Sequence, residues 1–401
     1  MSLLIWIMKP SLRLHSPHWG FNFTIATCLL MMLYFILPKS FLPERLDPAA
    51  TVTAKAFVWK VHKKHWPVWD ENATEIGVAM RRAIGEFWER NQFSVPRNMM
   101  HRNVTLTQSD LMHELRTRVP LRTIEPEDGP FSGNEWQEYL PRRSLEQSLG
   151  PLKTCAVVMS SGSIGNSALG AEIDKHDAVL RFNAAPTQKY STDVGNKTSM
   201  RLVNSQVLTS KYTGFLTDPL YSTGVLIVWD PSPYSKDLYA WYKKPDFNFF
   251  RTYLQYRKLH PEQPFYILSP SFQWNLWDII QENSPVHIQP HPPSSGMLGI
   301  VVMMNLCEQI SVYEFLPSRR RTSLCHYFES IRNKQCTMGH YHPLTFEKNL
   351  IKRLNHGTDY DIYSSGKVTL HGFSQLNSST SILPIRQLFL LWAVMISLIF
   401  K

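Results

Sequence analysis

The segment 155–205 constrains this chain of 401 residues most, because in it three apolar runs are each followed by a polar turn. The first run, 155–158, leads into a turn rich in Ser and Gly and then into a helix-compatible segment, 167–174. This order is typical of strand, tight turn and helix in an α/β fold. Since backbone N–H groups converge where a helix begins, such a turn is suited to bind a phosphate group.

The glycine spacing in this turn argues against a dinucleotide-binding enzyme. Gly162, Gly165 and Gly170 form the pattern G-x-x-G-x-x-x-x-G, whereas the dinucleotide fingerprint is G-x-G-x-x-G. A nicotinamide-dependent enzyme is therefore disfavoured. The turn by itself does not establish nucleotide binding, because most α/β proteins contain a turn of this kind.

Asparagine follows each of the next two apolar runs. Asn183 comes after 178–182, and Asn204 comes after 200–203. Ligands of open α/β sheets bind beyond the carboxyl ends of the strands, so we expect Ser160, Asn183 and Asn204 at one edge. Amide side chains can hydrogen-bond both a ribose and a pyrimidine. Taken alone, each Asn is better explained as a turn residue at a strand end.

The same segment resembles the large sialylmotif of the eukaryotic sialyltransferases, above all in HDAVLRFNAAPT and DVGNKTSMRLVNSQ. QPHPPSSGMLGIVVMMNLC, at 289–307, resembles the small motif of that family, and HYHPLTFE, at 340–347, covers the third and the very small motifs. VWDPSPY, KPDFNFF and CTMGHYHPLTFEKN resemble the β-galactoside α2,6-sialyltransferases in particular. The resemblance implies an α/β fold with a Rossmann-like, twisted, mostly parallel sheet flanked by helices, a variant of the GT-A glycosyltransferase fold.

The resemblance also implies an activity. It is the inverting transfer of sialic acid from CMP-sialic acid to the 6-hydroxyl of terminal β-galactose (Gal-β1,4-GlcNAc) on the N-glycans of glycoproteins, with no cofactor and no metal. His342 is the expected general base, because an imidazole with an ordinary pKa of about 6.5 is a proton acceptor in a mildly acidic Golgi lumen. Pro343 favours an extended conformation at His342, which we expect on a loop just before a helix at 344–354. Glu347 is expected to orient this region rather than to act as an acid.

The remaining site residues are carried over from the resembling enzymes by position. For the departing phosphate we expect Tyr341, His326 and the turn 292–296, which opens a helix at 297–306. The expected nucleotide contacts are Ser160, Asn183, Asn204, Ser294, Ser295, Gly296, Cys325, His326, Thr337, Tyr341 and Lys348. The expected galactose contacts are Gln206, Asp246 and Phe247. His326 stands where part of the family has tyrosine, and Phe247 where many relatives have it, so these two contacts stay open.

A D-x-D sequence at 359–361 is the manganese signature of many nucleotide-sugar transferases. It lies after the last motif and far from the predicted strand ends, and CMP has a single phosphate group, so we expect no metal site. Two alternatives remain open. One is a metal-dependent glycosyltransferase that uses this D-x-D. The other is a catalytically impaired lumenal glycan-binding relative, since the C-terminus departs from the family pattern after 373.

An uncharged apolar run at 21–37 lies between Lys9 and Arg13 on one side and Lys39 on the other. At about 1.5 Å per residue it is just long enough for a thin bilayer, and no cleavage signature follows it. We therefore expect a single-pass type II protein of the Golgi membrane with its catalytic domain in the lumen. The expected parts are a cytoplasmic tail at 1–20, a signal-anchor helix at 21–38, an extended lumenal stem at 39–90, a catalytic domain at 91–376 and an atypical hydrophobic tail at 377–401.

Cysteine usage agrees with a lumenal domain. Cys28 lies in the expected anchor, and the other cysteines form an even set that allows three pairings. The resemblance implies that Cys155 pairs with Cys307 and Cys325 with Cys336. A further disulfide of the family is not expected, because His113 stands at its first position and the chain departs from the family before the second. Sequons begin at Asn72, Asn103, Asn196 and Asn377.

The net charge of +10 raises the question of a nucleic-acid partner. The basic residues are scattered, with 319–321 the only tight run, and no recognition motif accompanies them, so nucleic acid is not expected as a partner. A positive surface that attracts sialic acid and nucleotide anions accounts for the charge. The oligomeric state, a homo-oligomer included, and the choice between the two galactoside α2,6 subgroups are left open.

Overall fold

The computed structural model describes residues 69, 74–97, 100–333, 336 and 339–377. All of them belong to one compact unit, 66–401. The expected signal anchor, most of the expected stem, the C-terminal tail and Thr337 lie outside the described residues. None of the helices in the described part is long and apolar enough to cross a membrane.

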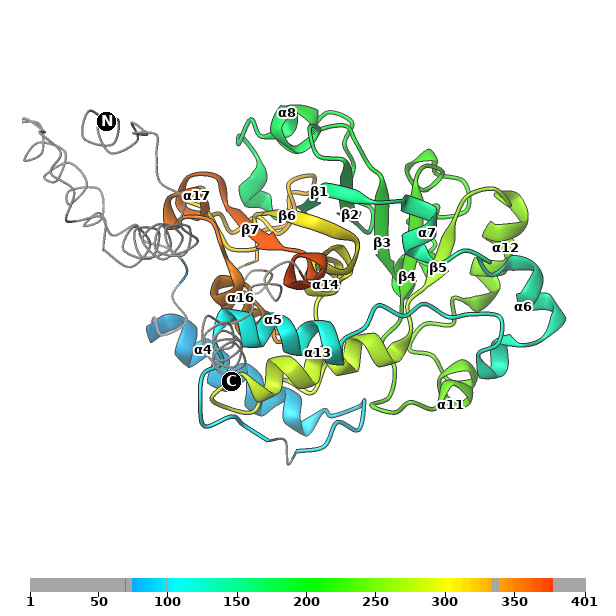
Figure 1. The fold of residues 1–401 in the computed structure, drawn as a ribbon, viewed down its shortest axis with the longest axis horizontal. Helices are drawn as coiled ribbons and strands as arrows, with labels where there is room; N and C mark the ends of the chain where they lie inside the picture. The colour runs from blue at the N-terminus through cyan, green and yellow to red at the C-terminus, as the bar shows by residue number, and fades with distance from the viewer. Residues whose placement is uncertain (1–68, 70–73, 98–99, 334–335, 337–338, 378–401) are drawn as a thin grey trace, which may run out of the picture. The chain divides into compact units, whose positions relative to one another are not determined.

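Within the described residues, seven strands form one sheet in the order β5-β4-β3-β2-β1-β6-β7 (Figure 1). Neighbouring strands run parallel, except that β7 is antiparallel to β6. The expected mostly parallel α/β sheet is therefore confirmed. The strands are β1 Leu152–Val158, β2 Ala178–Phe182, β3 Met200–Asn204, β4 Val225–Trp229, β5 Phe265–Ile267, β6 Cys307–Tyr313 and β7 Lys367–His371.

Continuous apolar runs form the central strands because helices cover both faces of the sheet. Every residue of β2 and of β4 is buried. Each of β2 and β3 contains one charged residue. These residues, Arg181 and Arg201, lie side by side on the two strands. Arg181 donates to the carbonyls of Val194 and Lys197, and Arg201 donates to those of Asn183 and Ala185. The two guanidinium groups therefore hold the loops that follow β2.

The helices lie in two layers. Leu180, Leu202 and Ile227 face one core, to which α5, α13, α14 and α16 contribute. On the opposite face, one cluster packs α6 and α12 against β3–β5, and a second packs α8 and α9 against β1 and β2. The helices are α4 Thr74–Glu89, α5 Gln108–Arg118, α6 Asn134–Tyr139, α7 Leu145–Leu149, α8 Gly170–Ile173, α9 Ser191–Val194, α10 Ser205–Thr209, α11 Leu238–Lys243, α12 Phe250–Leu259, α13 Pro270–Glu282, α14 Ser295–Leu306, α16 Leu344–Leu354 and α17 Asp359–Ser365.

Helix α14 packs closest to the sheet. A Cβ atom on Gly299 would lie 2.6 Å from a ring carbon of Phe182 and 2.8 Å from a methyl group of Leu180. Only glycine leaves room for this approach. The predicted helices at 297–306 and 344–354 are confirmed as α14 and α16.

The end of the expected stem differs from the extended chain that we predicted. Residues 74–89 form helix α4, in which Met80, Ala83 and Phe87 recur at helical spacing. Ala83 and Phe87 are buried, and the Phe87 ring packs edge-on against that of His291 at 4.8 Å. Charged residues between these positions hid the apolar spacing in the sequence.

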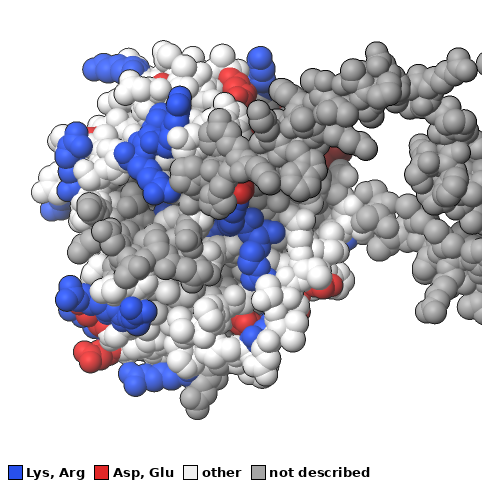
Figure 2. All heavy atoms as spheres, turned by 90° about the vertical axis from the view of Figure 1, so that its left-hand side faces the viewer, with Lys and Arg blue, Asp and Glu red and all other residues white. Residues whose placement is uncertain are grey.

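Both expected disulfides are confirmed. Cys155–Cys307 joins β1 to β6 across 152 residues of chain, and Cys325–Cys336 closes a short loop. Basic side chains lie in several separate groups, with acidic ones among them, on the face shown in Figure 2. This distribution agrees with the scattered charge of the sequence.

Candidate active site

The carboxyl ends of β2 and β3 bring two asparagines together. The backbone N–H of Asn204 donates to Asn183 Oδ1 at 3.0 Å, and Asn183 has φ of 46°, a left-handed conformation that asparagine tolerates. Asn204 Oδ1 accepts from the backbone N–H of Val207 at 3.1 Å and so caps α10. Because the protein uses both amide oxygens, the NH₂ groups are the atoms that can donate to a ligand.

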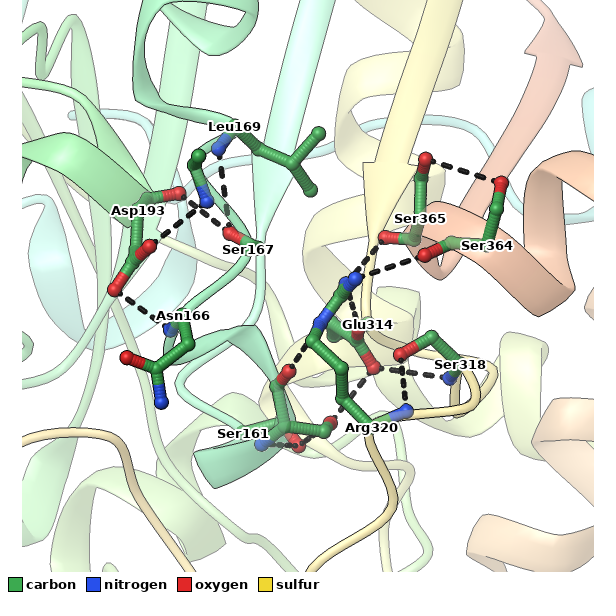
Figure 3. Close-up of polar contacts among 12 residues, drawn as sticks. Ser161, Asn166, Ser167, Leu169, Asp193, Glu314, Ser318, Arg320, Ser364 and Ser365 are labelled. Atoms are coloured by element: carbon green, nitrogen blue, oxygen red, sulfur yellow. Dashed lines mark hydrogen bonds and ion pairs between the residues drawn. The ribbon is translucent and has the colours of Figure 1, made fainter.

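The turn after β1 does not present the helix start that we predicted. The first α-helix after β1, α8, begins at Gly170 and has only four residues. The backbone N–H groups of Asn166 and Ala168 both donate to the carboxylate of Asp193, each at 2.9 Å (Figure 3). The expectation of a phosphate on a helix start at 167 is therefore wrong, because Asp193 already occupies these donors.

A buried carboxylate, that of Glu314, lies at the carboxyl ends of the paired strands β1 and β6 (Figure 3). Glu314 follows β6 directly and accepts from Ser163 Oγ at 2.7 Å and from Arg320 Nη2 at 2.7 Å. Arg320 also donates to the carbonyls of Ser163 and Ser364. The pair thereby joins the turn after β1 to α17. We missed Glu314 in the sequence, where its only signal is an acidic residue at the end of an apolar strand.

The turn after β1 also contacts the loop that carries Cys325 and His326. Ser160 accepts from the backbone N–H of Tyr327 at 3.1 Å, and Ser161 forms a β-bridge with His326. His326 Nδ1 lies 2.7 Å from a carboxylate oxygen of Glu329, and its ring stacks on Phe328. The structure thus brings Ser160 and His326 together at one strand end.

Helix α14 begins in a turn that its neighbours hold firmly. Ser294 is the N-cap, and its Oγ accepts from the backbone N–H of Met297. Glu347 of α16 is fully buried and accepts from Ser294 twice, from the backbone N–H at 2.7 Å and from Oγ at 2.6 Å. Trp229 donates through Nε1 to Ser295 Oγ at 3.0 Å. The start of this twelve-residue helix is therefore firmly held, and a helix start of this kind favours an anion.

Burial shifts the pKa values of the two ionisable groups in α16. It raises the pKa of Glu347 to about 7, against the opposing effect of the Ser294 hydrogen bonds. It lowers the pKa of Lys348 to about 8, an effect that the neighbouring Glu347 opposes. Lys348 is therefore a cation at neutral pH, and its ammonium group lies 4.7 Å from the centre of the Trp69 ring.

The imidazole of His342 is held in one tautomer. Its Nδ1 lies 2.8 Å from the carbonyl oxygen of Pro292. A carbonyl can only accept, so Nδ1 bears the proton and Nε2 carries the lone pair. Burial lowers the pKa of His342 below its usual value, which keeps the ring neutral. The ring lies 4.8 Å from that of Tyr341 and 6.4 Å from that of Trp229.

A third buried carboxylate, that of Asp230, holds the expected acceptor residues in place. Asp230 follows β4 and accepts from Trp241 Nε1 at 2.8 Å and from Ser205 Oγ. It also accepts from the backbone N–H groups of Asp246 and Phe247, at 3.0 Å and 3.1 Å. Burial raises the pKa of Asp230 to about 6. The sequence contained a signal that we missed, since Asp230 follows an apolar strand as Asn183 and Asn204 do.

Tyr341 packs against His342 and is near the carboxylates of Asp246 and Asp230. Burial raises its pKa well above the ordinary value, and the nearby charges of Asp246 and Asp230 add to the effect. Its hydroxyl therefore stays protonated and can donate. Gln206, the third expected acceptor contact, lies exposed on α10, one residue after Ser205.

Comparison with known proteins identifies the family. The sequence model of Glycosyltransferase family 29 (sialyltransferase) matches residues 133–358. Over 308 residues the chain is 52% identical to the beta-galactoside alpha-2,6-sialyltransferase 1 of Mus musculus, with 76% of each chain covered. The chain belongs to glycosyltransferase family 29. The resemblance to the sialyltransferases is therefore confirmed.

Two further relatives of this family 29 sialyltransferase extend the comparison. The beta-galactoside alpha-2,6-sialyltransferase 1 of Homo sapiens is 50% identical over 314 residues, with 77% of each chain covered. The beta-galactoside alpha-2,6-sialyltransferase 2 of Rattus norvegicus is 46% identical over 341 residues, which cover 84% of this chain and 64% of the relative. The matches include members of both named subgroups.

The D-x-D of this family 29 chain has structural partners of its own. Asp361 accepts from the backbone N–H of Thr358, which in turn caps α17. Asp359 forms an ion pair with Lys352. The two carboxylates thus stabilise the start of α17. No group of three or more His, Cys, Asp or Glu suited to a metal ion occurs within the part of the chain that the structure describes.

Proposed function

We propose that this chain transfers sialic acid from CMP-sialic acid to the 6-hydroxyl of a terminal β-galactose on glycoprotein N-glycans, with His342 as general base. The observation that carries the proposal is the hydrogen bond between His342 Nδ1 and the Pro292 carbonyl, which leaves the Nε2 lone pair to accept a proton. The galactoside acceptor and the α2,6 linkage are supported by relatives that are named for them and are 46–52% identical to this chain.

The donor side of the proposed site consists of strand ends and a helix start. Asn183 and Asn204 offer amide donors to the ribose and the cytosine, and Ser160 lies in the turn that follows β1. The N-terminus of α14, at Ser295 and Gly296, offers backbone N–H groups to an anion. These are the groups that we assign to the phosphate of CMP, together with the Tyr341 hydroxyl and the Lys348 ammonium.

The acceptor side consists of the segment that Asp230 holds. The backbone of Asp246 and Phe247 is fixed by the Asp230 carboxylate, so the Asp246 side chain can accept hydrogen bonds from galactose hydroxyls. Phe247 offers an apolar ring to a sugar face. Gln206 follows Ser205, which also donates to Asp230. A single buried carboxylate thus supports all three proposed acceptor residues.

The reaction proceeds as a single displacement. His342 Nε2 takes the proton of the galactose 6-hydroxyl. At the same time the oxygen of that hydroxyl bonds to the anomeric carbon of sialic acid. The bond from that carbon to the CMP phosphate oxygen breaks, and CMP leaves with both electrons as a phosphate monoester. Attack opposite the leaving group inverts the anomeric carbon, and the imidazolium then returns its proton to solvent.

We further infer that the fold is a variant of the GT-A class and that the chain is a type II Golgi membrane protein with a lumenal catalytic domain, 91–376. The two disulfides are typical of an oxidising compartment such as the secretory lumen. The expected anchor at 21–38 supplies the membrane attachment, and the sequons at Asn103 and Asn196 are in the lumenal part.

Transfer from CMP-sialic acid to N-acetyllactosamine tests the proposal. His342→Ala is expected to lower turnover by about a hundredfold or more, because general-base catalysis contributes on that order. His113→Ala, which changes an exposed histidine on α5, is the matched control and should retain full activity. Equal rates for His342→Ala and the wild type would refute the assignment of the base.

A further inference from the structure

A cavity of about 450 Å³ lies between α4 and the loop that follows α13. Met80, Ile84 and Trp88 recur at every fourth residue of α4, so they present one face of that helix to the cavity. The volume is in the range of small-molecule sites, about 300–1,000 Å³. None of the lining residues has a role in the site described above. The lining consists of Met80, Arg81, Ile84, Trp88, Arg97, Val286 and His287.

The lining contains an aromatic ring, that of Trp88, whose buried N–H group has no hydrogen-bond acceptor among the described residues. The His287 ring packs edge-on against Trp88 at 5.9 Å, and the guanidinium of Arg97 lies 5.7 Å from the centre of the same ring. Trp88 Nε1 is buried, and it has no hydrogen-bonding partner among the residues that the structure describes. A buried N–H without an acceptor costs free energy, and an oxygen atom of a bound ligand would remove that cost.

The charged side chains that line the cavity are all basic. Arg81 and Arg97 contribute two guanidinium groups, and no carboxylate lies in the lining. Arg97 donates through Nη2 to the carbonyl oxygen of Trp88 at 3.0 Å, which holds it at the edge of the cavity. Met80, Ile84 and Val286 form the apolar part of the wall. Guanidinium groups bind carboxylates in a planar, two-point geometry, so this lining fits a carboxylate joined to an apolar group.

We propose that this cavity binds the terminal sialic acid of a glycan. The sugar carboxylate pairs with Arg81 and Arg97, the methyl group of its N-acetyl chain packs on the apolar wall, and a hydroxyl or carbonyl oxygen accepts from Trp88 Nε1. The proposal rests on the proposed function, because a sialylated glycan is the product of that reaction.

Helix α4 connects this cavity to the catalytic loop. Phe87, next to Trp88, packs edge-on against His291 at 4.8 Å and against Tyr341 at 6.1 Å. Helix α4 therefore lines the proposed sialic acid site with one face. With the adjacent face, at Phe87, it supports Tyr341, the residue before His342. A glycan with one sialylated branch would thus be bound beside the site that modifies its other branch.

Binding of a methyl α-sialoside to the full chain tests the proposal. The donor site is first saturated with an unreactive fluorinated analogue of CMP-sialic acid, so that the probe can bind only elsewhere, and binding is followed by saturation-transfer NMR and calorimetry. Arg81→Ala and Arg97→Ala are each expected to weaken binding about tenfold or more, since each removes a charge-assisted hydrogen bond. Arg82→Ala, the next residue on α4, is exposed and outside the cavity, and should bind as the wild type does.

Absence of binding to the saturated enzyme, or an equal loss in Arg82→Ala, overturns the proposal. Binding of decanoate in place of the sialoside also overturns it, because the cavity would then accept any apolar anion. His342→Ala must still bind the sialoside. A lack of transfer by the wild type would therefore refute the proposed reaction alone, whereas a lack of sialoside binding would refute this inference alone.

Discussion

The replacement Glu347→Gln tests how the start of α14 is held. Glu347 is 0% exposed, and both of its oxygens accept hydrogen bonds from Ser294. Its pKa is about 7 in the folded protein, against 4.5 for an ordinary glutamate. A raised folded pKa means that the folded state binds more protons than the unfolded state between these two values. The contribution of Glu347 to stability is therefore complete below pH 4.5 and is lost as the pH rises through 7.

The magnitude follows from the difference between the two pKa values. It corresponds to about 3 kcal/mol of unfolding free energy between pH 4.5 and neutral pH, since each pH unit contributes about 1.4 kcal/mol. Glutamine has the shape of the protonated acid but does not titrate. At pH 5, Glu347→Gln should therefore cost only about 1 kcal/mol. As the pH rises, the wild type should lose stability relative to the variant.

Urea unfolding of the two proteins between pH 5 and pH 7.5 provides the measurement. The range ends below the pKa of Lys348, about 8, which limits the change in charge of this neighbour in the folded protein. We expect the difference in unfolding free energy between variant and wild type to change by about 2–3 kcal/mol in favour of glutamine across the range. A difference that does not change with pH would refute the burial of an ionisable carboxylate at Ser294.

Three further predictions concern other parts of the site. Asp230→Asn should lower the unfolding free energy by about 2–4 kcal/mol, because an amide cannot accept all the hydrogen bonds that Asp230 receives, and a normal melting temperature would contradict this. Trp229→Phe keeps an aromatic ring but removes the donor to Ser295 and part of the buried indole, so kcat/KM for CMP-sialic acid should fall several-fold and the unfolding free energy by about 1–3 kcal/mol. The acid limb of kcat/KM should lie below pH 6.5, since burial lowers the pKa of His342, and a limb above pH 6.5 would argue against it.

Much of the scaffold could be predicted from local patterns. The apolar runs at 155–158, 178–182 and 200–203 became the central strands β1, β2 and β3, and Asn183 and Asn204 do lie side by side at their ends. Strands buried on both faces are continuously apolar, and that signal needs no knowledge of the partner strand. The helix at 344–354 was likewise predicted at its observed bounds, because proline marks its start.

The predictions that failed depended on contacts between distant parts of the chain. A phosphate was expected at the turn and helix start after β1, but Asp193 accepts the N–H groups of Asn166 and Ala168 there from more than twenty residues away. The segment that forms α4 was expected to be extended. Its helical conformation is stabilised by packing, in which Phe87 contacts the rings of His291 and Tyr341. The sequence pattern within each segment does not indicate which distant residue the segment contacts.

Local sequence patterns were thus enough to predict the class of fold, the central strands, the family and the histidine that we propose as base. Which carboxylates support the site depends on contacts that form only in the folded chain. Asp230 and Glu347 are buried, and each holds backbone that we propose contacts a ligand. The physical reason is that apolar periodicity is a property of neighbouring residues, whereas a buried charge is stable only where the folded chain brings donors to it from several elements.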